Sequence, residues 1–220
     1  MQKYAIIVAG GSGTRMKSDL PKQFIELLGK PILMHSIEAF HFDDIKIILV
    51  LPKAQIEFWK ELMVKHQFKV PHQIVEGGKA RFHSVKNGLE SIDSTSGLVA
   101  IHDGVRPLIK QAIISESYAS AEQHGNAIVS VGLKDSIRSV SDSGNKQEDR
   151  SKFRLIQTPQ TFQLQLIKAA FKQPYDPIFT DDASVLERAG HKINLIDGDY
   201  QNIKITTPED LTVAQSLLKA

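Results

Sequence analysis

A glycine-rich stretch near the start of the chain, followed by two cations, contains the residue types that bind phosphate. Gly10, Gly11 and Gly13 lie within four positions of one another, directly after an apolar run. Glycines let backbone amides approach a phosphate closely, and positive side chains offset its charge. Because Arg15 and Lys22 follow, the stretch predicts a phosphate-binding loop with two charge partners.

The better-known glycine motifs do not account for this stretch. A dinucleotide-binding fingerprint reads Gly-x-Gly-x-x-Gly, but Met16 stands where the third glycine is required. A P-loop requires Gly-Lys-Ser or Gly-Lys-Thr after its spacer, and neither tripeptide follows. An ordinary strand-to-loop turn is the alternative, and the two neighbouring cations favour phosphate binding over it.

A carboxylate follows another apolar run, in the stretch from His102 to Pro107. An aspartate beside a phosphate loop repels the ligand unless a cation lies between them, and Mg²⁺ prefers carboxylate and phosphate oxygens. We therefore predict that Asp103 binds Mg²⁺. The alternative is an aspartate that caps a turn or pairs with Arg106. His102 is expected to be a packed histidine, and no role is assigned to it.

Two glycines and a serine mark a third candidate stretch. Gly77 and Gly78 close a predicted strand, and a helix is expected to start near Arg81. Glycines at this position permit tight backbone contact, for example with the edge of a base, and Ser84 adds a hydroxyl. For Arg81 the spacing leaves two roles open, a ligand contact or a scaffold salt bridge.

Polar side chains also occur later in the chain. Lys204 lies between two isoleucines, which predicts that its side chain points away from a buried face, toward either solvent or a cleft. Arg150 and Thr158 lie at predicted turns. Thr180 is expected to cap a helix whose positive end is favoured by the two aspartates that follow.

Composition limits the classes of protein to which this chain can belong. With 220 residues, 41% of them hydrophobic, the chain can form one substantial core, and one domain is expected. A net charge of +2 without a run of Lys or Arg gives no indication of nucleic-acid binding. The absence of cysteine excludes disulfides and permits a cytoplasmic location. No stretch approaches the length of a membrane span.

Short apolar runs alternate with segments of helical periodicity. The runs are rich in Val and Ile and mostly lack alternation, as is typical of strands buried on both faces. The predicted strands are Tyr4–Val8, Ile45–Leu51, Leu98–Ile101, Ala127–Val131 and Ile193–Ile196. The predicted helices are Ile32–Phe40, Gln55–His66, Arg81–Ser91, Gln111–His124 and a final helix capped by Thr207. This order predicts an α/β fold with a mostly parallel sheet, in which ligands bind at the carboxyl ends of strands.

One polar region interrupts this alternation. Residues 134–158 contain a predicted turn at Ser143 and Gly144, between possible strands at Ser136–Val140 and Phe153–Gln157. We expect a projecting β-hairpin arm. Because a two-stranded ribbon is marginally stable alone, the arm is expected to pack against something, plausibly another subunit. A disordered surface loop is the alternative.

Taken together, these stretches resemble one protein family. The glycine stretch with Pro21-Lys22-Gln23 resembles the signature of sugar and polyol nucleotidyltransferases. The full set resembles the 2-C-methyl-D-erythritol 4-phosphate cytidylyltransferase family, from Tyr4 to the final helix. The stretches that carry this resemblance are Gly77-Gly78 with Arg81 and Ser84, His102-Asp103-x-x-Arg106-Pro107, Gln157-Thr158-Pro159-Gln160, Thr180-Asp181-x-Ala183-Ser184 and Asn202-Ile203-Lys204-x-Thr206.

The resemblance implies an activity and an architecture. The activity is a Mg²⁺-dependent transfer of CMP from CTP to a polyol phosphate in non-mevalonate isoprenoid biosynthesis, with release of pyrophosphate. The architecture is a Rossmann-like three-layer fold, in which residues 1–220 form one nucleotidyltransferase domain with the arm, about 134–158, inserted. The family is a homodimer with interlocking arms, so Ser136 and Arg150 are expected to serve their own or the neighbouring site.

The resemblance also implies a role for each candidate residue. The residues expected to bind CTP are Ala9, Gly10, Gly11, Gly13, Gly78, Arg81 and Ser84. Those expected to stabilise the reacting phosphates are Arg15, Lys22 and Lys204, and Asp103 is expected to bind Mg²⁺. Those expected to bind the polyol phosphate are Ser136, Arg150, Thr158 and Thr180. Two positions depart from the usual family pattern: Ala80 replaces a frequent acidic residue, and Ser136 a frequent threonine.

Three other functions compete with this one. Ribitol-5-phosphate cytidylyltransferase is a relative with the same chemistry and an acceptor of similar size. A non-catalytic nucleotide sensor on this fold would need no acceptor site, whereas Arg150, Thr158 and Thr180 are all present. An NAD-dependent oxidoreductase is disfavoured by the missing third glycine.

Overall fold

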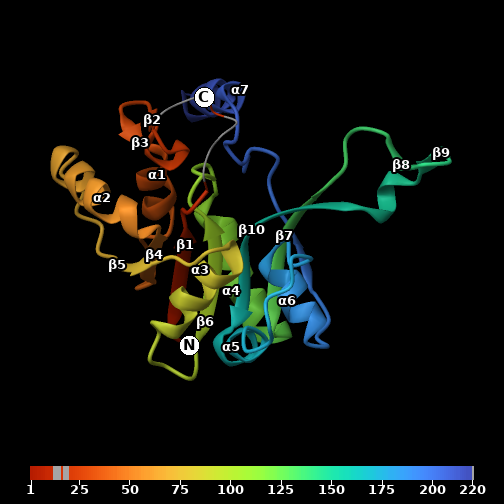
Figure 1. Ribbon diagram of the computed structural model, residues 1–220, viewed down its shortest axis with the longest axis horizontal. Helices are drawn as coiled ribbons and strands as arrows, with labels where there is room; N and C mark the ends of the chain where they lie inside the picture. The colour runs from red at the N-terminus through yellow and green to blue at the C-terminus, as the bar shows by residue number, and fades with distance from the viewer. Residues whose placement is uncertain (12–15, 17–19, 220) are drawn as a thin grey trace.

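A seven-stranded sheet runs through the centre of the computed structural model, which describes residues 1–11, 16 and 20–219 (Figure 1). The strand order is β11-β7-β10-β6-β1-β4-β5. The strands are β1 Lys3–Val8, β4 Lys46–Leu51, β5 Gln73–Glu76, β6 Leu98–Asp103, β7 Asn126–Gly132, β10 Arg154–Gln163 and β11 Leu195–Asp197. Within this sheet β10 is antiparallel to both of its neighbours, and the other adjacent pairs are parallel. The predicted α/β fold with a mostly parallel sheet is confirmed.

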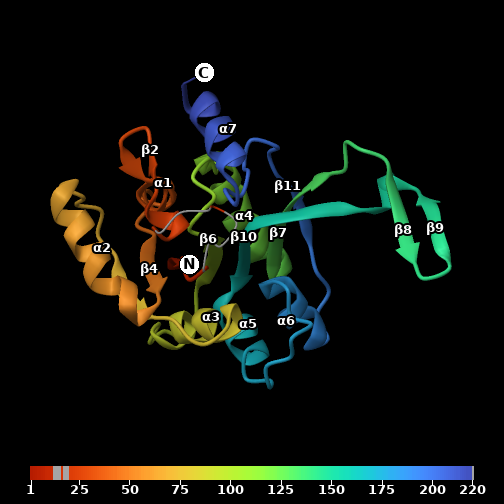
Figure 2. The ribbon, with the colours of Figure 1, turned by 45° about the horizontal axis from the view of Figure 1, so that its top comes forward.

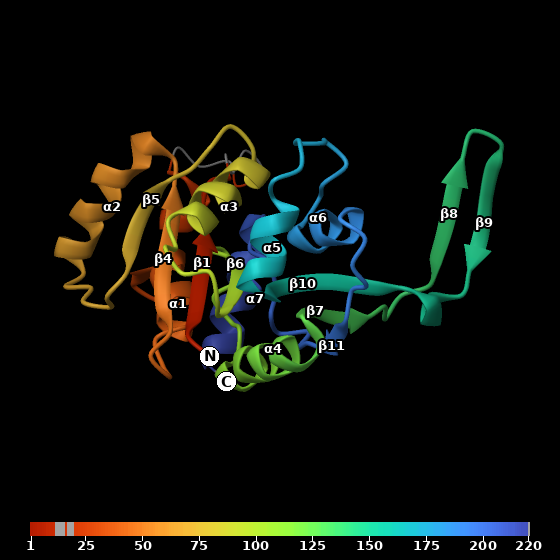
Figure 3. The same cartoon turned by 90° about the horizontal axis from the view of Figure 1, so that it is seen from below.

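Helices cover both faces of the sheet, because successive residues of its strands point to opposite sides. Ala5 and Ile7 of β1 pack in one apolar cluster, with side chains from α1 (Ile32–Ala39), α2 (Lys53–Lys65) and α4 (Gln111–His124). Tyr4 and Ile6 pack in a second cluster, with α3 (Arg81–Glu90), α5 (Leu164–Ala170) and α6 (Asp182–Arg188). Figure 3 shows α3, α5 and α6 on one side of the sheet and α4 on the other. The result is the expected three-layer arrangement.

The C-terminal helix lies over a smaller apolar cluster. Helix α7 (Pro208–Lys219) packs near the short strands β2 (Glu26–Leu27) and β3 (Lys30–Pro31). Thr207 precedes it, and the Thr207 hydroxyl accepts a 3.4 Å hydrogen bond from the amide of Asp210. The predicted cap of the final helix is therefore confirmed.

The polar region forms a hairpin that projects from the sheet. Strands β8 (Ile137–Ser141) and β9 (Gly144–Glu148) pair antiparallel, and the hairpin extends far from the other elements (Figure 2). The projecting arm was predicted correctly, but its second strand was not. Residues Phe153–Gln157 were expected in the arm, whereas Arg154 to Gln163 forms β10 of the main sheet, where Leu155 pairs with Val131.

One predicted cap is displaced by a single residue. Asp181, not Thr180, caps α6, because the Asp181 carboxylate accepts a 2.9 Å hydrogen bond from the amide of Ser184. The Ser184 hydroxyl in turn accepts a hydrogen bond from the Asp181 amide, which completes a capping box. This leaves Thr180 exposed and directly before the cap. No helix in the described part of the chain is both long and apolar enough to cross a membrane.

Candidate functional site

Two cavities meet at the carboxyl ends of the central strands. The first has a volume of about 280 Å³, and its lining includes the end of β1, the glycines that follow β1 and β5, and the start of α3. The second, also of about 280 Å³, is lined mainly by β10 and the loop before α6. Arg81, Asp103 and Lys204 line both cavities. Two ligands bound in these cavities would therefore meet at the same three side chains.

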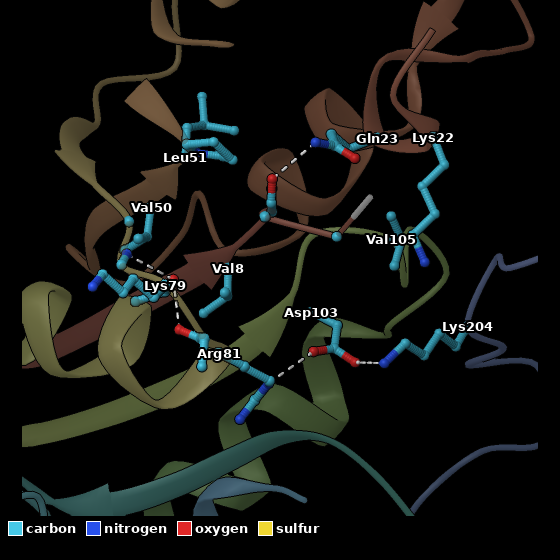
Figure 4. Close-up of a pocket in the computed structure, with 18 residues that line it drawn as sticks. Val8, Lys22, Gln23, Val50, Leu51, Lys79, Arg81, Asp103, Val105 and Lys204 are labelled. Carbon is cyan, nitrogen blue, oxygen red and sulfur yellow. Dashed lines mark hydrogen bonds and ion pairs between the residues drawn. The ribbon is translucent and has the colours of Figure 1, made fainter. Parts of the chain in front are cut away.

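Asp103 lies at the centre of a cluster of positive charges (Figure 4). The Lys204 ammonium lies 2.9 Å from one carboxylate oxygen, and the Nε atoms of Arg81 and Arg106 each lie 3.7 Å from the carboxylate. Burial alone would raise the pKa of Asp103, but these three charges hold that pKa well below its ordinary value. Asp103 is therefore ionised across the physiological pH range. Of the two positions left open for Lys204, solvent or a cleft, the cleft is confirmed.

Arg81 is held by Asp182, which the sequence placed at the start of a helix without connecting it to Arg81. Its two terminal nitrogens donate to the two carboxylate oxygens of Asp182 at 2.8 and 2.6 Å. Asp182 is only 1% exposed. Burial opposes the charge on Arg81, but Asp182 and Asp103 hold the pKa of this guanidinium above its ordinary value. In this structure Arg81 forms the scaffold salt bridge that the sequence left as one of two alternatives.

The amide of Gln160 fixes Asp182 in turn. Its carbonyl oxygen accepts hydrogen bonds from the backbone amides of Asp182 and Ala183 at 3.0 and 2.8 Å. Its nitrogen donates to Asp181 at 2.9 Å. The start of α6 is therefore anchored to β10, and this anchor positions the carboxylate that holds Arg81.

The glycines after β5 form a tight loop over the first cavity. A Cβ atom on Gly78 would lie 2.3 Å from the Cβ of His83, so only glycine fits there. The Ser84 hydroxyl accepts a 3.1 Å hydrogen bond from the Gly78 amide and donates to the Ala80 carbonyl at 3.2 Å. Ser84 thus shapes the loop, and both Ser84 and Gly78 line the cavity as expected for nucleotide-binding residues.

The N-terminal loop is described only in part. Ala9, Gly10, Gly11 and Lys22 line the first cavity. The two other predicted residues of this loop, Gly13 and Arg15, lie outside the described residues.

Lys22 and its neighbour are fixed at the cavity wall. Lys22 is only 9% exposed. Gln23, beside it, donates a 2.9 Å hydrogen bond to the carbonyl oxygen of Ala9, which ties the Pro-Lys-Gln stretch to the end of β1.

His102 is fully buried, as its assignment as a packed histidine requires, but both ring nitrogens have polar partners. One nitrogen lies 3.1 Å from the carbonyl oxygen of Arg106, and the other lies 3.0 Å from the Thr158 hydroxyl. Burial lowers the pKa of His102 to about 4, so the ring is neutral at pH 7.

Of the four residues predicted to bind the acceptor, the structure brings two to the site. Thr158 and Thr180 line the second cavity. Among the described residues, Ser136 and Arg150 line neither cavity. Both are exposed at the ends of the hairpin, where the Arg150 guanidinium donates to the carbonyl oxygen of Lys134.

Asp103 is the carboxylate that lines both cavities, and Asp181 lines only the second, so a metal ion at the junction would be held by Asp103. Within the described ranges, no group of three or more His, Cys, Asp or Glu side chains is placed to hold a metal. Mg²⁺ in nucleotide sites usually has one or two protein carboxylates, with phosphate oxygens and water completing its shell. The ionised Asp103 fits such an ion bound together with phosphates.

Comparison with known proteins gives similarities over nearly the whole chain. Residues 4–220 match the family model of 2-C-methyl-D-erythritol 4-phosphate cytidylyltransferase (IspD). The enzyme of that name from Bacteroides thetaiotaomicron is 49% identical, over 99% of this chain and 100% of the relative. Its counterpart from Porphyromonas gingivalis is 45% identical, over 99% of this chain and 98% of the relative.

Solved structures agree with the sequence comparisons. The Francisella tularensis 2-C-methyl-D-erythritol 4-phosphate cytidylyltransferase is 30% identical, with a TM-score of 0.80, and the match covers 98% of this chain and 99% of that one. The 4-diphosphocytidyl-2C-methyl-D-erythritol synthase of Anaerococcus prevotii is 29% identical, with a TM-score of 0.84. The match covers 100% of this chain and 96% of that one.

Proposed function

The chain belongs to the 2-C-methyl-D-erythritol 4-phosphate cytidylyltransferase family, and from this membership we propose how its site performs the reaction. The reaction transfers CMP from CTP to 2-C-methyl-D-erythritol 4-phosphate, giving 4-diphosphocytidyl-2-C-methyl-D-erythritol and pyrophosphate. One observation carries the proposal: two cavities share Arg81, Asp103 and Lys204. We assign the first cavity to CTP and the second to the acceptor phosphate.

The chemistry requires positioning and positive charge rather than a general base. An oxygen of the acceptor phosphate attacks the α-phosphorus of CTP, and the bond from that phosphorus to the pyrophosphate leaving group breaks. A phosphate monoester has a second pKa of about 6, so the nucleophile is already ionised near neutral pH. The main barrier is repulsion between two anions, which fixed cations and correct alignment lower.

The cations of the site supply this positive charge. We propose that Lys22 and Lys204 contact the reacting phosphates, since Lys22 lines the CTP cavity and Lys204 lines both cavities. Arg15 has the same proposed role. The terminal nitrogens of Arg81 pair with Asp182, and its Nε lies 3.7 Å from Asp103, so Arg81 acts on the nucleotide by holding Asp103.

The proposed metal is Mg²⁺, held by Asp103. The fit rests on an ionised, buried carboxylate at the junction of the two cavities. When bound, the ion would neutralise developing charge on the phosphates. Asp103 and Lys204 would orient those phosphates from the protein side.

We propose further that the protein acts as a homodimer and that the hairpin arm completes a neighbouring site. Ser136 and Arg150 flank the hairpin, which extends away from the other elements (Figure 2). Val140 on the hairpin is 82% exposed, and Phe153 beside it is 43% exposed. Apolar side chains on a projecting ribbon are more stable when another surface covers them. In a dimer, Ser136 and Arg150 would reach the acceptor phosphate of the partner subunit.

Pyrophosphate release tests the activity directly. The protein is incubated with CTP, Mg²⁺ and either 2-C-methyl-D-erythritol 4-phosphate or ribitol 5-phosphate. We expect rapid pyrophosphate release with the first acceptor and little with the second. Faster release with ribitol 5-phosphate would overturn the acceptor assignment, and no release with either acceptor would favour a nucleotide sensor.

A further inference from the structure

His102 connects three parts of the site without lining either cavity. It is the fifth residue of β6, it is fully buried, and the ring of Phe40 packs against it with centroids 5.0 Å apart. One ring nitrogen, Nε2, lies 3.1 Å from the carbonyl oxygen of Arg106. The other, Nδ1, lies 3.0 Å from the hydroxyl oxygen of Thr158 on β10.

The partners of the ring determine where its proton lies. A carbonyl oxygen only accepts hydrogen bonds, so Nε2 of His102 must carry the hydrogen and donate to Arg106. In the described part of the chain, no carboxylate oxygen lies within hydrogen-bond distance of the ring. With the ring hydrogen on Nε2, Nδ1 of this fully buried ring is left as an acceptor, and the Thr158 hydroxyl donates to it. That hydroxyl oxygen then accepts the amide hydrogen of Asp103 at 3.1 Å.

These hydrogen bonds hold the end of β6, beyond the last residue that pairs with β10. Pairing between β10 and β6 ends at Gln160 and Ile101, and the register of β10 shifts between Ile156 and Gln160. Beyond that point Asp103 is paired on one side only, with Val8 of β1. The hydroxyl of Thr158 supplies the bond on the other side.

We propose that His102, as the Nε2–H tautomer, is a positioning residue that fixes the backbone of Asp103 through the Thr158 hydroxyl. The Thr158 proton then points at His102 and not at the acceptor phosphate. Thr158 acts on the reaction through Asp103, although it lines the acceptor cavity. The catalytic consequence rests on the proposed function, whereas the hydrogen-bond relay does not.

Nitrogen NMR of the histidine ring tests the relay independently of activity. In the wild-type protein near pH 7.5, we expect the long-range proton–nitrogen spectrum of His102 to show a protonated Nε2 and a bare Nδ1. A Thr158→Val variant should shift the Nδ1 resonance, since that nitrogen loses its donor. A protonated Nδ1 in the wild type, or an unchanged Nδ1 resonance in the variant, would overturn the proposal.

Kinetics of two matched valine variants test the consequence. Thr161 lies on the same strand, is fully buried, and shares a 2.8 Å hydroxyl bond with Ser117. Thr158→Val and Thr161→Val each remove one buried hydroxyl from β10, so we expect similar losses of thermal stability. Only Thr158→Val should lower kcat, by about 10- to 100-fold, as is usual when a partner of a metal ligand is removed.

The metal and acceptor dependences separate this role from direct substrate contact. A positioning role predicts that Thr158→Val raises the Mg²⁺ concentration needed for half-maximal rate and leaves the acceptor KM nearly unchanged. Thr158→Ser, which keeps the hydroxyl, should restore most of kcat. Equal kcat values for the two valine variants, or a rise in acceptor KM alone, would overturn the proposal. A wild-type protein that releases no pyrophosphate would instead overturn the proposed function, and the NMR result would still decide the relay.

Discussion

At the scale of single residues, the site depends on one carboxylate surrounded by cations. Asp103 contacts Lys204 at 2.9 Å and two arginines at 3.7 Å. An anion within such a cluster stays ionised and limits the mutual repulsion of the cations. The site can therefore hold several positive charges close together before any phosphate binds.

The pH dependence of the reaction should follow the substrate rather than Asp103. The pKa of Asp103 lies well below 3.8, because nearby cations outweigh the effect of burial. The acceptor phosphate takes up its proton near pH 6, and its monoanion is the weaker nucleophile. We therefore expect kcat/KM for the acceptor to fall as pH decreases from 8 to 5, with a midpoint of about 6.

Asp103→Asn provides the control for this pH profile. The variant should lower kcat by about 100-fold or more, as expected when a key electrostatic group is lost. It should leave the midpoint of the pH profile in place. A midpoint that moves in the variant would show that Asp103 titrates in this range and contradict the prediction.

The ion pair between Arg81 and Asp182 should be essential for stability as well as for the site. Arg81→Ala leaves the buried Asp182 carboxylate without its partner, which should cost about 3–5 kcal/mol in the free energy of unfolding. Urea denaturation measures this loss. The control is Arg188→Ala on α6, the helix that carries Asp182; the exposed pair of Arg188 with Asp176 spans 3.7 Å and should contribute about 1 kcal/mol or less. Equal losses in the two variants would contradict the prediction.

Spacing together with the family resemblance identified residues that line the cavities but not those that hold them in place. Asp103, Lys204 and Gly78 follow predicted strands, and strand ends of an α/β sheet collect at one edge. Asp182 lies 101 positions from Arg81, and no local pattern predicts a contact across that separation. Asp182 forms an ion pair because it is buried, and its burial can be seen only in the folded structure.

At the scale of elements, a hydrogen bond between Trp59 and His72 connects helix α2 to the segment before β5, and protonation of His72 would break this bond. The Trp59 indole donates to Nε2 of His72 at 3.0 Å, and Nδ1 of His72 donates to the carbonyl oxygen of Val70 at 2.7 Å. Burial lowers the pKa of His72 below 6.5. A protonated Nε2 could no longer accept from Trp59.

Acidification should therefore loosen this contact. Because the pKa of His72 is lower in the folded protein than in the unfolded chain, its contribution to stability is present above pH 6.5 and is lost as pH falls. Trp59 is the only tryptophan, so its fluorescence should stay constant from pH 8 to 7 and change below 6.5. His72→Leu should reduce the pH dependence of unfolding, although the lowered pKa values of His35 and His102 leave a residual slope of the same sign. The same slope in both proteins would contradict the prediction.

Element boundaries were predictable where a pattern changes abruptly and were wrong where it does not. Gln111–His124 was predicted residue for residue, because Gly125 takes a left-handed conformation with φ 85° and ends the helix. The end of the arm was harder to predict, because β10 runs from the exposed Arg154 into the buried core without a turn. Its exposed half has the polarity of the hairpin, so the sequence placed Phe153–Gln157 in the arm.

At the scale of the whole molecule, the chain separates the two groups of residues that the sequence assigned to the acceptor. Thr158 and Thr180 line the second cavity, whereas Ser136 and Arg150 lie beside a hairpin that points away from it (Figure 2). A two-fold dimer would resolve this separation, because each arm would reach the other subunit's cavity. The proposed dimer and the proposed role of Arg150 therefore depend on each other.

Mixing two inactive variants tests this arrangement. Lys22→Ala disables the cavity of its own subunit, and Arg150→Ala disables the arm; each alone should have little activity. In a mixed dimer, one site combines both defects, and the other pairs an intact cavity with an intact arm. Random exchange of subunits should therefore restore about one quarter of wild-type pyrophosphate release. If each arm serves its own subunit, or if the protein is a monomer, every site carries one defect and mixing restores nothing.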